Sequence, residues 1–266
     1  MNYRSVLKRS SLELLLFKYY NYYMVIRMNA IKTTDLCKYY KDVKAVNKVN
    51  LEIKEGELFG LLGVNGAGKT TLIKMLSGLI KSTSGEIDIF KMKYPEDTID
   101  IKKILNISPQ ETAIAPNLTV IEKLEFMAGI YLIKDKDKKI KELVNIFNLD
   151  NVLNKKTKNL SGGWQRKLSL AISLINEPKI LFLDEPTLGL DVISRKELWN
   201  ILDSLKGKMT IILTTHYMEE AEYLSDRIGV INSGSLITIN TPKELLKKTK
   251  TKKLEDAFIK IVGGSL

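Results

Sequence analysis

The chain has 266 residues, of which 44% are hydrophobic, so it can bury a sizeable core as one domain or two small ones. This composition excludes a disordered chain, a collagen and a disulfide-stapled miniprotein. The formal charge of +11 lies mainly at the ends, with a net +4 in residues 1–27 and +5 in residues 243–253, and the near-neutral remainder lacks the basic stripe of a nucleic-acid-binding protein.

Two further features limit where the protein is expected to work. Cys37 is the only cysteine and cannot form an intrachain disulfide, which fits a reducing compartment such as the cytosol. The longest stretch without a charged side chain, residues 228–242, has 15 residues, whereas a membrane-spanning helix needs about 20. We therefore expect a cytoplasmic protein that does not cross a bilayer by itself.

Residues 1–27 resemble a signal peptide, because basic residues precede an apolar stretch. Glu13 and Lys18 interrupt that stretch, however, and no small-residue cleavage site follows. We interpret this segment as an N-terminal extension that is not native, with Met28 as the alternative start. An amphipathic anchor on a membrane surface is the rival interpretation.

Three short β-rich runs open the rest of the chain, at Ile31–Leu36, Val49–Ile53 and Leu58–Leu62. The third run is apolar on both faces, as in a strand buried inside an α/β sheet. A glycine-rich turn follows, and apolar residues then recur at helical spacing over Lys69–Leu79. This order predicts the first unit of an α/β layer.

Helical periodicity replaces the β signal between about residues 113 and 176. One helix starts at residues 116–119, a second apolar stripe begins at Ile140, and a third helix is predicted from Gly163 to Ile175. Strands and helices then alternate again, at Ile180–Leu183, Ser194–Leu205, Thr210–Leu213 and Met218–Leu224. The pattern predicts an α/β layer interrupted by an all-helical subdomain.

The C-terminal region is predicted to begin with a hairpin, Ile228–Ile231 and Leu236–Asn240, that turns at residues 232–234. We interpret the lysine-rich residues 243–253 as a solvated loop, and we expect a short last helix at Leu254–Ile261.

Residues 63–70, GVNGAGKT, fill the pattern G-x-x-x-x-G-K-[ST] between the buried strand and the helix. Glycines let the backbone curl around an anion, so that N–H groups and the helix N-terminus face phosphate oxygens. We expect Lys69 to contact the β- and γ-phosphates of a nucleotide and the Thr70 hydroxyl to bind Mg²⁺. The residues predicted to bind the nucleotide here are Gly63, Asn65, Gly66, Ala67, Gly68, Lys69, Thr70 and Thr71.

Two adjacent carboxylates end the apolar strand at Ile180–Leu183. Side chains of neighbouring residues at a strand end point apart, so we predict that Asp184 binds Mg²⁺ and that Glu185 acts as the base toward the attacking water. A proline-capped turn with solvated carboxylates is the alternative, and the phosphate loop favours the catalytic interpretation. His216, the only histidine, ends the next strand, and we predict that it contacts the γ-phosphate or the attacking water.

Ser161, Gly162 and Gly163 predict a second anion site, because Ser161 can cap the helix that begins at the glycines and leave N–H groups free for phosphate. One triphosphate needs both sites, yet a single chain need not fold them onto each other. A head-to-tail dimer solves this problem, since each chain lends its serine and glycines to the nucleotide held at the other chain's lysine.

These motifs, in this order, resemble the nucleotide-binding subunit of an ATP-binding-cassette (ABC) transporter: GVNGAGKTT, Gln110, LSGGWQ, ILFLDEP, LGLD and His216. The resemblance implies an α/β fold, a P-loop NTPase mixed sheet with an antiparallel β subdomain and an inserted all-helical subdomain. It places the ATPase domain at residues 28–246, before a short basic tail at 247–266. It also implies that Tyr40 stacks on the adenine, that Gln110 senses Mg²⁺ and the membrane partner, and that Asp191 lies in the loop that communicates between the two ATP sites.

Three positions depart from the family pattern. Lys41 stands where a glycine usually follows the aromatic residue, so the choice of Tyr40 over Tyr39 depends on register. Val64 replaces a frequent proline of the phosphate loop, which should matter little. Trp164 replaces the usual Gln or Met, where it can pack at the dimer interface or within the helical subdomain.

Within the family, the segments SPQETAIAPNLTVIEKLEF and TTHYMEEAEYLSDRIGVI are similar to those of bacterial exporters that move drugs, lipids or polysaccharides. The predicted function is therefore a cytoplasmic ATPase subunit, peripheral at the inner face of the cell membrane. We expect it to bind ATP and Mg²⁺ as a homo- or heterodimer, to drive export through separate transmembrane subunits, and to bind no nucleic acid. Two alternatives stay open, an importer ATPase and a soluble ABC ATPase that acts on nucleic acid or ribosomes. Members of the second kind carry coiled-coil insertions or tandem cassettes, which this sequence lacks.

Overall fold

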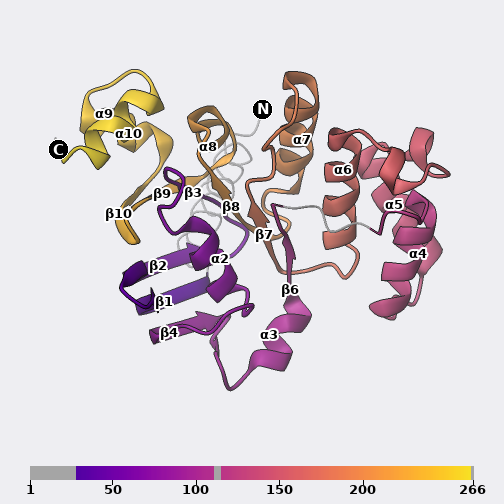
Figure 1. Ribbon diagram of the computed structural model, residues 1–266, viewed down its shortest axis with the longest axis horizontal. Helices are drawn as coiled ribbons and strands as arrows, with labels where there is room; N and C mark the ends of the chain where they lie inside the picture. The colour runs from indigo at the N-terminus through magenta and orange to yellow at the C-terminus, as the bar shows by residue number, and fades with distance from the viewer. Residues whose placement is uncertain (1–27, 111–114, 265–266) are drawn as a thin grey trace, which may run out of the picture.

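The computed structural model describes residues 28–110 and 115–264, which form two sheets flanked by helices (Figure 1). The predicted N-terminal extension and the predicted start of the helical subdomain at residue 113 lie outside the described residues. The larger sheet has the strand order β10-β9-β3-β8-β7-β6, with β10 antiparallel to β9 and the other neighbours parallel. Its strands are β3 (Leu58–Leu62), β6 (Leu105–Ser108), β7 (Ile180–Asp184), β8 (Thr210–Thr215), β9 (Arg227–Asn232) and β10 (Ser235–Asn240).

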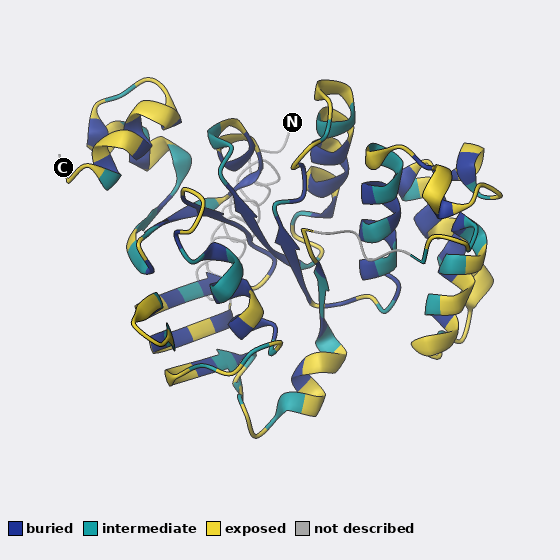
Figure 2. Ribbon diagram, viewed as in Figure 1, coloured by how far each residue is buried: buried dark blue, intermediate teal, exposed yellow. Residues whose placement is uncertain are grey.

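Every residue of β3, β7 and β8 is buried, which explains the apolar runs in these strands (Figure 2). The buried polar residues of β7 and β8, Asp184, Thr210, Thr214 and Thr215, lie at the strand ends. In register, Leu62 of β3 lies opposite Thr215 of β8, and Asp184 of β7 lies opposite Thr214. The carboxyl ends of these three parallel strands therefore meet at one edge, where the phosphate loop, Glu185 and His216 begin.

A smaller antiparallel sheet, with the order β2-β1-β4-β5, packs beside the first. Its long strands, β1 (Asn29–Tyr40) and β2 (Val43–Lys54), exceed the predicted runs because β-bulges break the alternation of apolar residues. Asp35 and Lys48 take positive φ at these irregularities, 44° and 46°. The remaining strands are β4 (Ser84–Ile89) and β5 (Met92–Lys93).

Helices cover both sheets and build the inserted subdomain. The helices are α2 (Lys69–Leu76), α3 (Thr98–Ile104), α4 (Val120–Ile130), α5 (Lys136–Phe147), α6 (Gly162–Ser173), α7 (Val192–Leu205), α8 (Met218–Leu224), α9 (Pro242–Thr249) and α10 (Leu254–Val262). Helices α4, α5 and α6 lie at one side of the molecule (Figure 1) and share an apolar core that includes Leu124, Phe147 and Leu168. The layers confirm the predicted fold class, a mixed sheet with an antiparallel β subdomain and an all-helical insertion.

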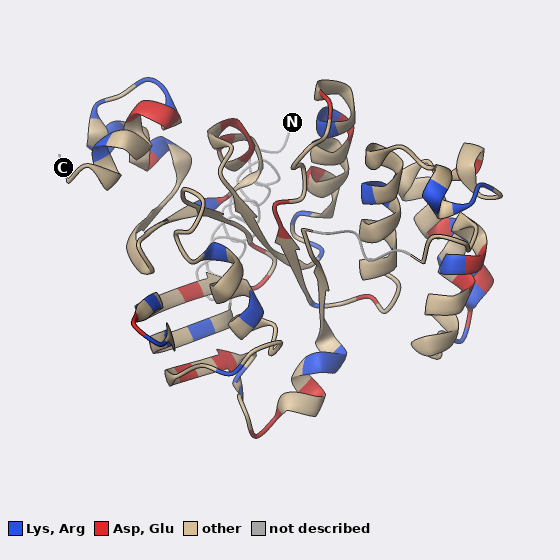
Figure 3. Ribbon diagram, viewed as in Figure 1, with Lys and Arg blue, Asp and Glu red and all other residues tan. Residues whose placement is uncertain are grey.

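The solvated loop predicted over residues 243–253 is wrong, because α9 occupies most of it. Thr241 and Glu244 form a capping box at its start, and Leu245 turns inward to an apolar cluster with Phe258 of α10 and Val230 of β9. The lysines lie on the exposed face, and Figure 3 shows their charge over α9 and the turn that follows. Helix α9 also crosses the domain boundary predicted at residue 246. Among the described residues, no helix is long and apolar enough to span a bilayer.

Candidate functional site

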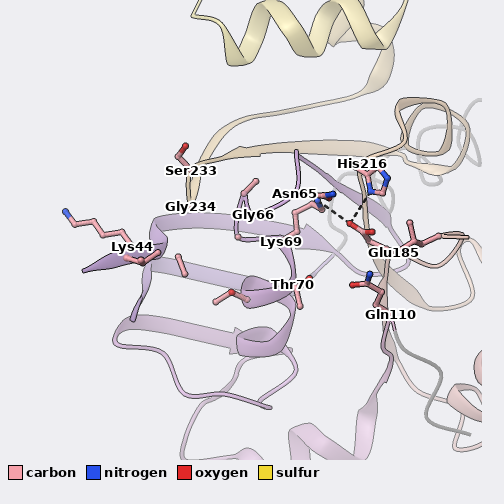
Figure 4. Close-up of a pocket in the computed structure, with 16 residues that line it drawn as sticks. Lys44, Asn65, Gly66, Lys69, Thr70, Gln110, Glu185, His216, Ser233 and Gly234 are labelled. Atoms are coloured by element: carbon pink, nitrogen blue, oxygen red, sulfur yellow. Dashed lines mark ion pairs between the residues drawn. The ribbon is translucent and has the colours of Figure 1, made fainter. Parts of the chain in front are cut away.

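A cavity of about 660 Å³ opens at the carboxyl ends of the parallel strands (Figure 4). The phosphate loop forms its floor, and the β9–β10 turn and the start of β2 form one wall. Its lining residues are Val43, Lys44, Ala45, Asn65, Gly66, Ala67, Gly68, Lys69, Thr70, Thr71, Gln110, Glu185, Leu188, His216, Ser233 and Gly234. The structure thus brings together most of the predicted phosphate loop with Gln110, Glu185 and His216.

The phosphate loop has a conformation that needs its glycines. Gly66 and Gly68 take φ of +79° and +103°, and a side chain at Gly68 would collide with the carbonyl of Ala45 in β2. Helix α2 starts directly after this loop, so its free N–H groups face the cavity. This is the local geometry that accepts an anion.

Lys69 is 4% exposed, and its ammonium group points back over the loop. Its Nζ donates to the carbonyls of Gly63 (2.8 Å) and Val64 (3.1 Å) and lies 3.4 Å from Glu185 Oε1. A buried ammonium is costly unless it is paired and hydrogen-bonded. The carbonyls and the carboxylate therefore hold the lysine in place without a ligand.

Glu185 lies between Lys69 and His216, whose Nδ1 is 3.2 Å from the same Oε1 atom, without hydrogen-bond geometry (Figure 4). The backbone of Glu185 has φ of +46°, a conformation that non-glycine residues rarely adopt. Its N–H group donates to Thr214, to the carbonyl at 3.1 Å and to Oγ1 at 3.0 Å. Strand β8 thus fixes the backbone that aims this carboxylate.

The carboxylate of Asp184 lies in a hydroxyl cluster. Its Oδ1 accepts hydrogen bonds from Thr214 Oγ1 (2.6 Å) and Thr70 Oγ1 (3.1 Å). No group of three or more acidic, histidine or cysteine side chains that could hold a metal occurs in the part of the chain that the structure describes. Hydroxyl and carboxylate oxygens fit Mg²⁺, which binds through one or two protein groups together with water and substrate phosphates.

Other predicted site residues lie outside the residues that line this cavity. The Tyr40 ring is 49% exposed at the end of β1, with Lys38 Nζ 5.2 Å from its centroid. Ser161 occupies the N-cap position of α6, but its side chain makes no capping hydrogen bond. Ser161 and Gly162 are both exposed. These roles stay predictions.

Ser194, a residue that the sequence did not indicate, lies between Asp191 and the start of α6. The carboxylate of Asp191 caps α7 and accepts from Ser194 Oγ (2.7 Å), and this hydrogen bond lowers the pKa of Asp191. A side chain at Gly163 would collide with Ser194 Oγ. Ser194 therefore joins the predicted second anion site to the predicted communication loop.

A buried polar group behind the cavity also escaped the sequence analysis. Glu220 of α8 is fully buried, and its Oε1 accepts from Thr187 Oγ1 (2.8 Å) and Trp199 Nε1 (3.1 Å). Its Oε2 has no partner among the described residues, and burial raises the pKa of Glu220. Thr187 follows Glu185 by two residues, so Glu220 anchors the segment that carries the candidate base.

Trp164 and Arg166, both on α6, contact different parts of the molecule. Trp164 packs against the core of the helical subdomain, with Lys167 Nζ 4.5 Å from its ring centroid. Arg166 is buried, and among the residues that the structure describes it donates to three backbone carbonyls near Gln110 and Glu185. No motif marked Arg166, because a single arginine on a helix has no distinctive pattern.

Comparisons with known proteins agree with this geometry. Residues 46–188 match the family model described as ABC transporter. The chain is 38% identical over 240 residues to the Escherichia coli protein named probable multidrug ABC transporter ATP-binding protein YbhF, over 87% of this chain and 41% of that protein. It is 44% identical over 198 residues to the human phospholipid-transporting ATPase ABCA3, over 74% of this chain and 12% of ABCA3. The chain therefore spans only about two fifths and about one eighth of these relatives.

A solved structure shows the same fold. The dimeric post-hydrolysis state of the ATP-binding cassette MJ0796, bound to ADP and Pi, has a TM-score of 0.71 and 27% sequence identity. The likeness covers 79% of this chain and 98% of that chain. It confirms the predicted P-loop NTPase fold.

Proposed function

This chain belongs to the ABC transporter family, and from that premise we propose that it binds and hydrolyses ATP in the cavity above the phosphate loop. The observation that carries the proposal is the position of Glu185, with Oε1 3.4 Å from Lys69 Nζ and 3.2 Å from His216 Nδ1. One carboxylate thus lies between the cation of the phosphate loop and the only histidine of the sequence, a position that suits a base toward a terminal phosphate.

The chain's own residues divide the reaction between them. The triphosphate competes with Glu185 for the ammonium of Lys69, so binding of ATP frees the carboxylate to accept a proton. The water oxygen then bonds to the γ-phosphorus, the bond to the bridging oxygen breaks, and ADP leaves with that electron pair. The proton of the water moves to Glu185, and His216 orients the γ-phosphate.

Thr70 and Asp184 supply the oxygen donors that suit Mg²⁺, and Gln110 faces the same cavity. When bound there, the ion would neutralise charge on the phosphates. In the same scheme, Tyr40 stacks on the adenine.

We further propose that two chains pair head to tail around two nucleotides. The start of α6 is exposed, and its residues do not line the cavity above the phosphate loop of the same chain. Its free N–H groups can therefore bind a phosphate that is held by another chain. The solved cassette described above is dimeric with ADP and Pi bound, which supports this arrangement. The partner chain is identical or closely related.

The transport role proposed is export through separate transmembrane subunits at the inner face of the cell membrane. One relative is named a probable multidrug ABC transporter ATP-binding protein, a name of the exporter type that supports this direction, whereas the name phospholipid-transporting ATPase of another states no direction. Co-purification of the chain with a polytopic membrane protein, followed by stimulation of hydrolysis by that protein, is the expected result. Uptake of cargo into intact cells, instead of efflux, would favour the importer alternative.

The assigned roles are tested by Glu185→Gln, which keeps the shape of the side chain and removes the base. We expect phosphate release to fall on the order of 10²- to 10⁴-fold while ATP binding persists, and an ATP-bound dimer to accumulate in size-exclusion chromatography. The matched control is Glu219→Gln, an exposed glutamate on α8. A Glu185→Gln chain that hydrolyses ATP at the wild-type rate and traps no dimer would overturn the proposal.

A further inference from the structure

Arg166 is a buried cation, and all of its hydrogen-bond acceptors within residues 28–110 and 115–264 are backbone carbonyls. It is 5% exposed, and it donates through Nε to Pro186 O (2.7 Å), through Nη1 to Pro109 O (2.6 Å) and through Nη2 to Asp184 O (3.3 Å). No carboxylate forms an ion pair with it within the described ranges. Burial lowers the pKa of Arg166 to about 10, so the group stays charged at neutral pH.

The three carbonyls belong to the two segments that carry the candidate catalytic groups. Asp184 and Pro186 are the residues on either side of Glu185, and Pro109 directly precedes Gln110. Glu185 has the rare positive φ described above, a backbone conformation that persists only when its surroundings fix it. The rigid guanidinium fork fixes the chain on both sides of that residue at once, which a flexible ammonium group cannot do.

Arg166 belongs to α6, the helix whose start is the predicted second anion site. Arg166 follows the N-cap Ser161 by five residues, a rise of about 7.5 Å along the axis of α6. A hydrogen-bonded helix transmits a shift of its first turn to its second with little loss. Any contact that moves Ser161 and Gly162 therefore also moves the fork that holds Glu185 and Gln110.

We propose that Arg166 is a positioning residue that couples the start of α6 to the backbone of Glu185 and Gln110. A nucleotide held by a second copy of the chain contacts this start, and Arg166 passes the resulting shift to the base and to Gln110 of its own cavity. This inference depends on the head-to-tail dimer of the proposed function. It gives each ATP site a physical link to the other through one side chain.

A purely structural role for Arg166 predicts different measurements. A residue that only joins the helical subdomain to the core would, when replaced, lower the unfolding temperature and affect ATP binding and turnover together. A positioning residue changes kcat and leaves KM, ATP affinity and dimer formation near their wild-type values.

The decisive variant is Arg166→Lys, which keeps the charge and loses the fork. We expect kcat to fall on the order of 10- to 100-fold, with KM and the Kd for a fluorescent ATP analogue within about twofold of wild type. In the Glu185→Gln background, Arg166→Lys should still form the ATP-bound dimer. Arg166→Met is the second variant. If it does not fold, the result for Arg166→Lys alone tests the inference.

The matched control is Lys167→Met, the next residue on the same helix. Lys167 is 6% exposed and pairs with Glu197 at 2.7 Å, away from the segments around Gln110 and Glu185. We expect its kcat to stay within about twofold of wild type. Equal loss of kcat in Lys167→Met and Arg166→Lys, or a wild-type kcat in Arg166→Lys, would overturn the inference. An inactive wild-type chain would instead count against the proposed function.

Discussion

The phosphate-loop end of the cavity and the start of α6 differ in how far a single chain completes them. Lys69 is buried and compensated by Glu185 and two carbonyls, whereas Ser161 and Gly162 are exposed and the serine hydroxyl makes no capping bond. A buried charge must be compensated within the chain, while an exposed helix start can be solvated until a ligand arrives. The difference indicates that nucleotide binding joins a finished half-site to an open one.

The largest expected effect is the loss of ATP hydrolysis when either half-site is damaged. Lys69→Met and Ser161→Arg should each lower ATP hydrolysis by 10²-fold or more, on the order of the loss of a phosphate clamp. An equimolar mixture of the two variants should recover about one quarter of the wild-type rate, because half of the dimers then hold one intact composite site. Phosphate release from the separate and mixed proteins checks this expectation.

A mixture of Lys69→Met with Glu185→Gln is the control, since both changes damage the same half-site. No dimer in that mixture contains an intact site, so no activity should return. Recovery in both mixtures, or in neither, would contradict the division into two half-sites.

A smaller effect is expected on stability when Glu220, the buried residue that anchors the segment carrying Glu185, is replaced. Glu220→Ala leaves the hydroxyl of Thr187 and the indole N–H of Trp199 without an acceptor, so the free energy of unfolding should fall by about 1–3 kcal/mol. Because burial raises the folded pKa of Glu220, the folded chain binds more protons, and stability should be lost as pH rises above the unfolded value of 4.5. Hydrogen bonds to the carboxylate, and then the charge of Arg195, offset part of this shift.

Glu220→Gln separates the two causes in that experiment. The amide oxygen still accepts from Thr187 and Trp199, but the group no longer titrates. Urea unfolding at pH 5 and pH 8 should show a smaller loss of stability with pH than in the wild type. An unchanged pH dependence would mean that another group controls it.

The smallest expected effect concerns the open half-site. Ser161→Ala removes no capping bond, so it should change the free energy of unfolding by less than about 0.5 kcal/mol, whereas Thr119→Ala should cost about 0.5–2 kcal/mol by breaking the capping box of α4. The same Ser161→Ala change should lower ATP hydrolysis by about tenfold, through a lost bond to phosphate. Equal destabilisation by both variants in thermal melts would show that Ser161 is an ordinary cap.

The sequence predicted the parts of the molecule whose chemistry is local. The phosphate loop and the strand before Asp184 combine a short motif with an uninterrupted apolar run, and both lie where they were expected. Bulges in β1 and β2 break the two-residue period, so only the regular parts of these strands were predicted. In α9, many lysines outweighed one inward leucine and a capping box, and the prediction of a loop failed.

Contacts between distant segments account for what the sequence could not show. Arg166 binds carbonyls, which every residue carries, so no partner residue type accompanies it. Glu220 looks like any acidic residue in the first turn of a helix, and only the packing of α7 against α8 shows that it is buried. Tertiary packing decided the roles of both residues.

The buried Gly234, in the turn between β9 and β10, has a consequence for the cavity that it lines. Its N–H donates to Ala67 of the phosphate loop (3.0 Å), and its carbonyl accepts from Asn47 of β2 (2.8 Å). With φ of +77° and the carbonyl of Lys44 in the way, no larger residue fits without displacing β2. A substitution at Gly234 would therefore displace β2 and reshape the cavity wall that Lys44 and Gly234 share. Directed evolution for altered nucleotide preference can use this position.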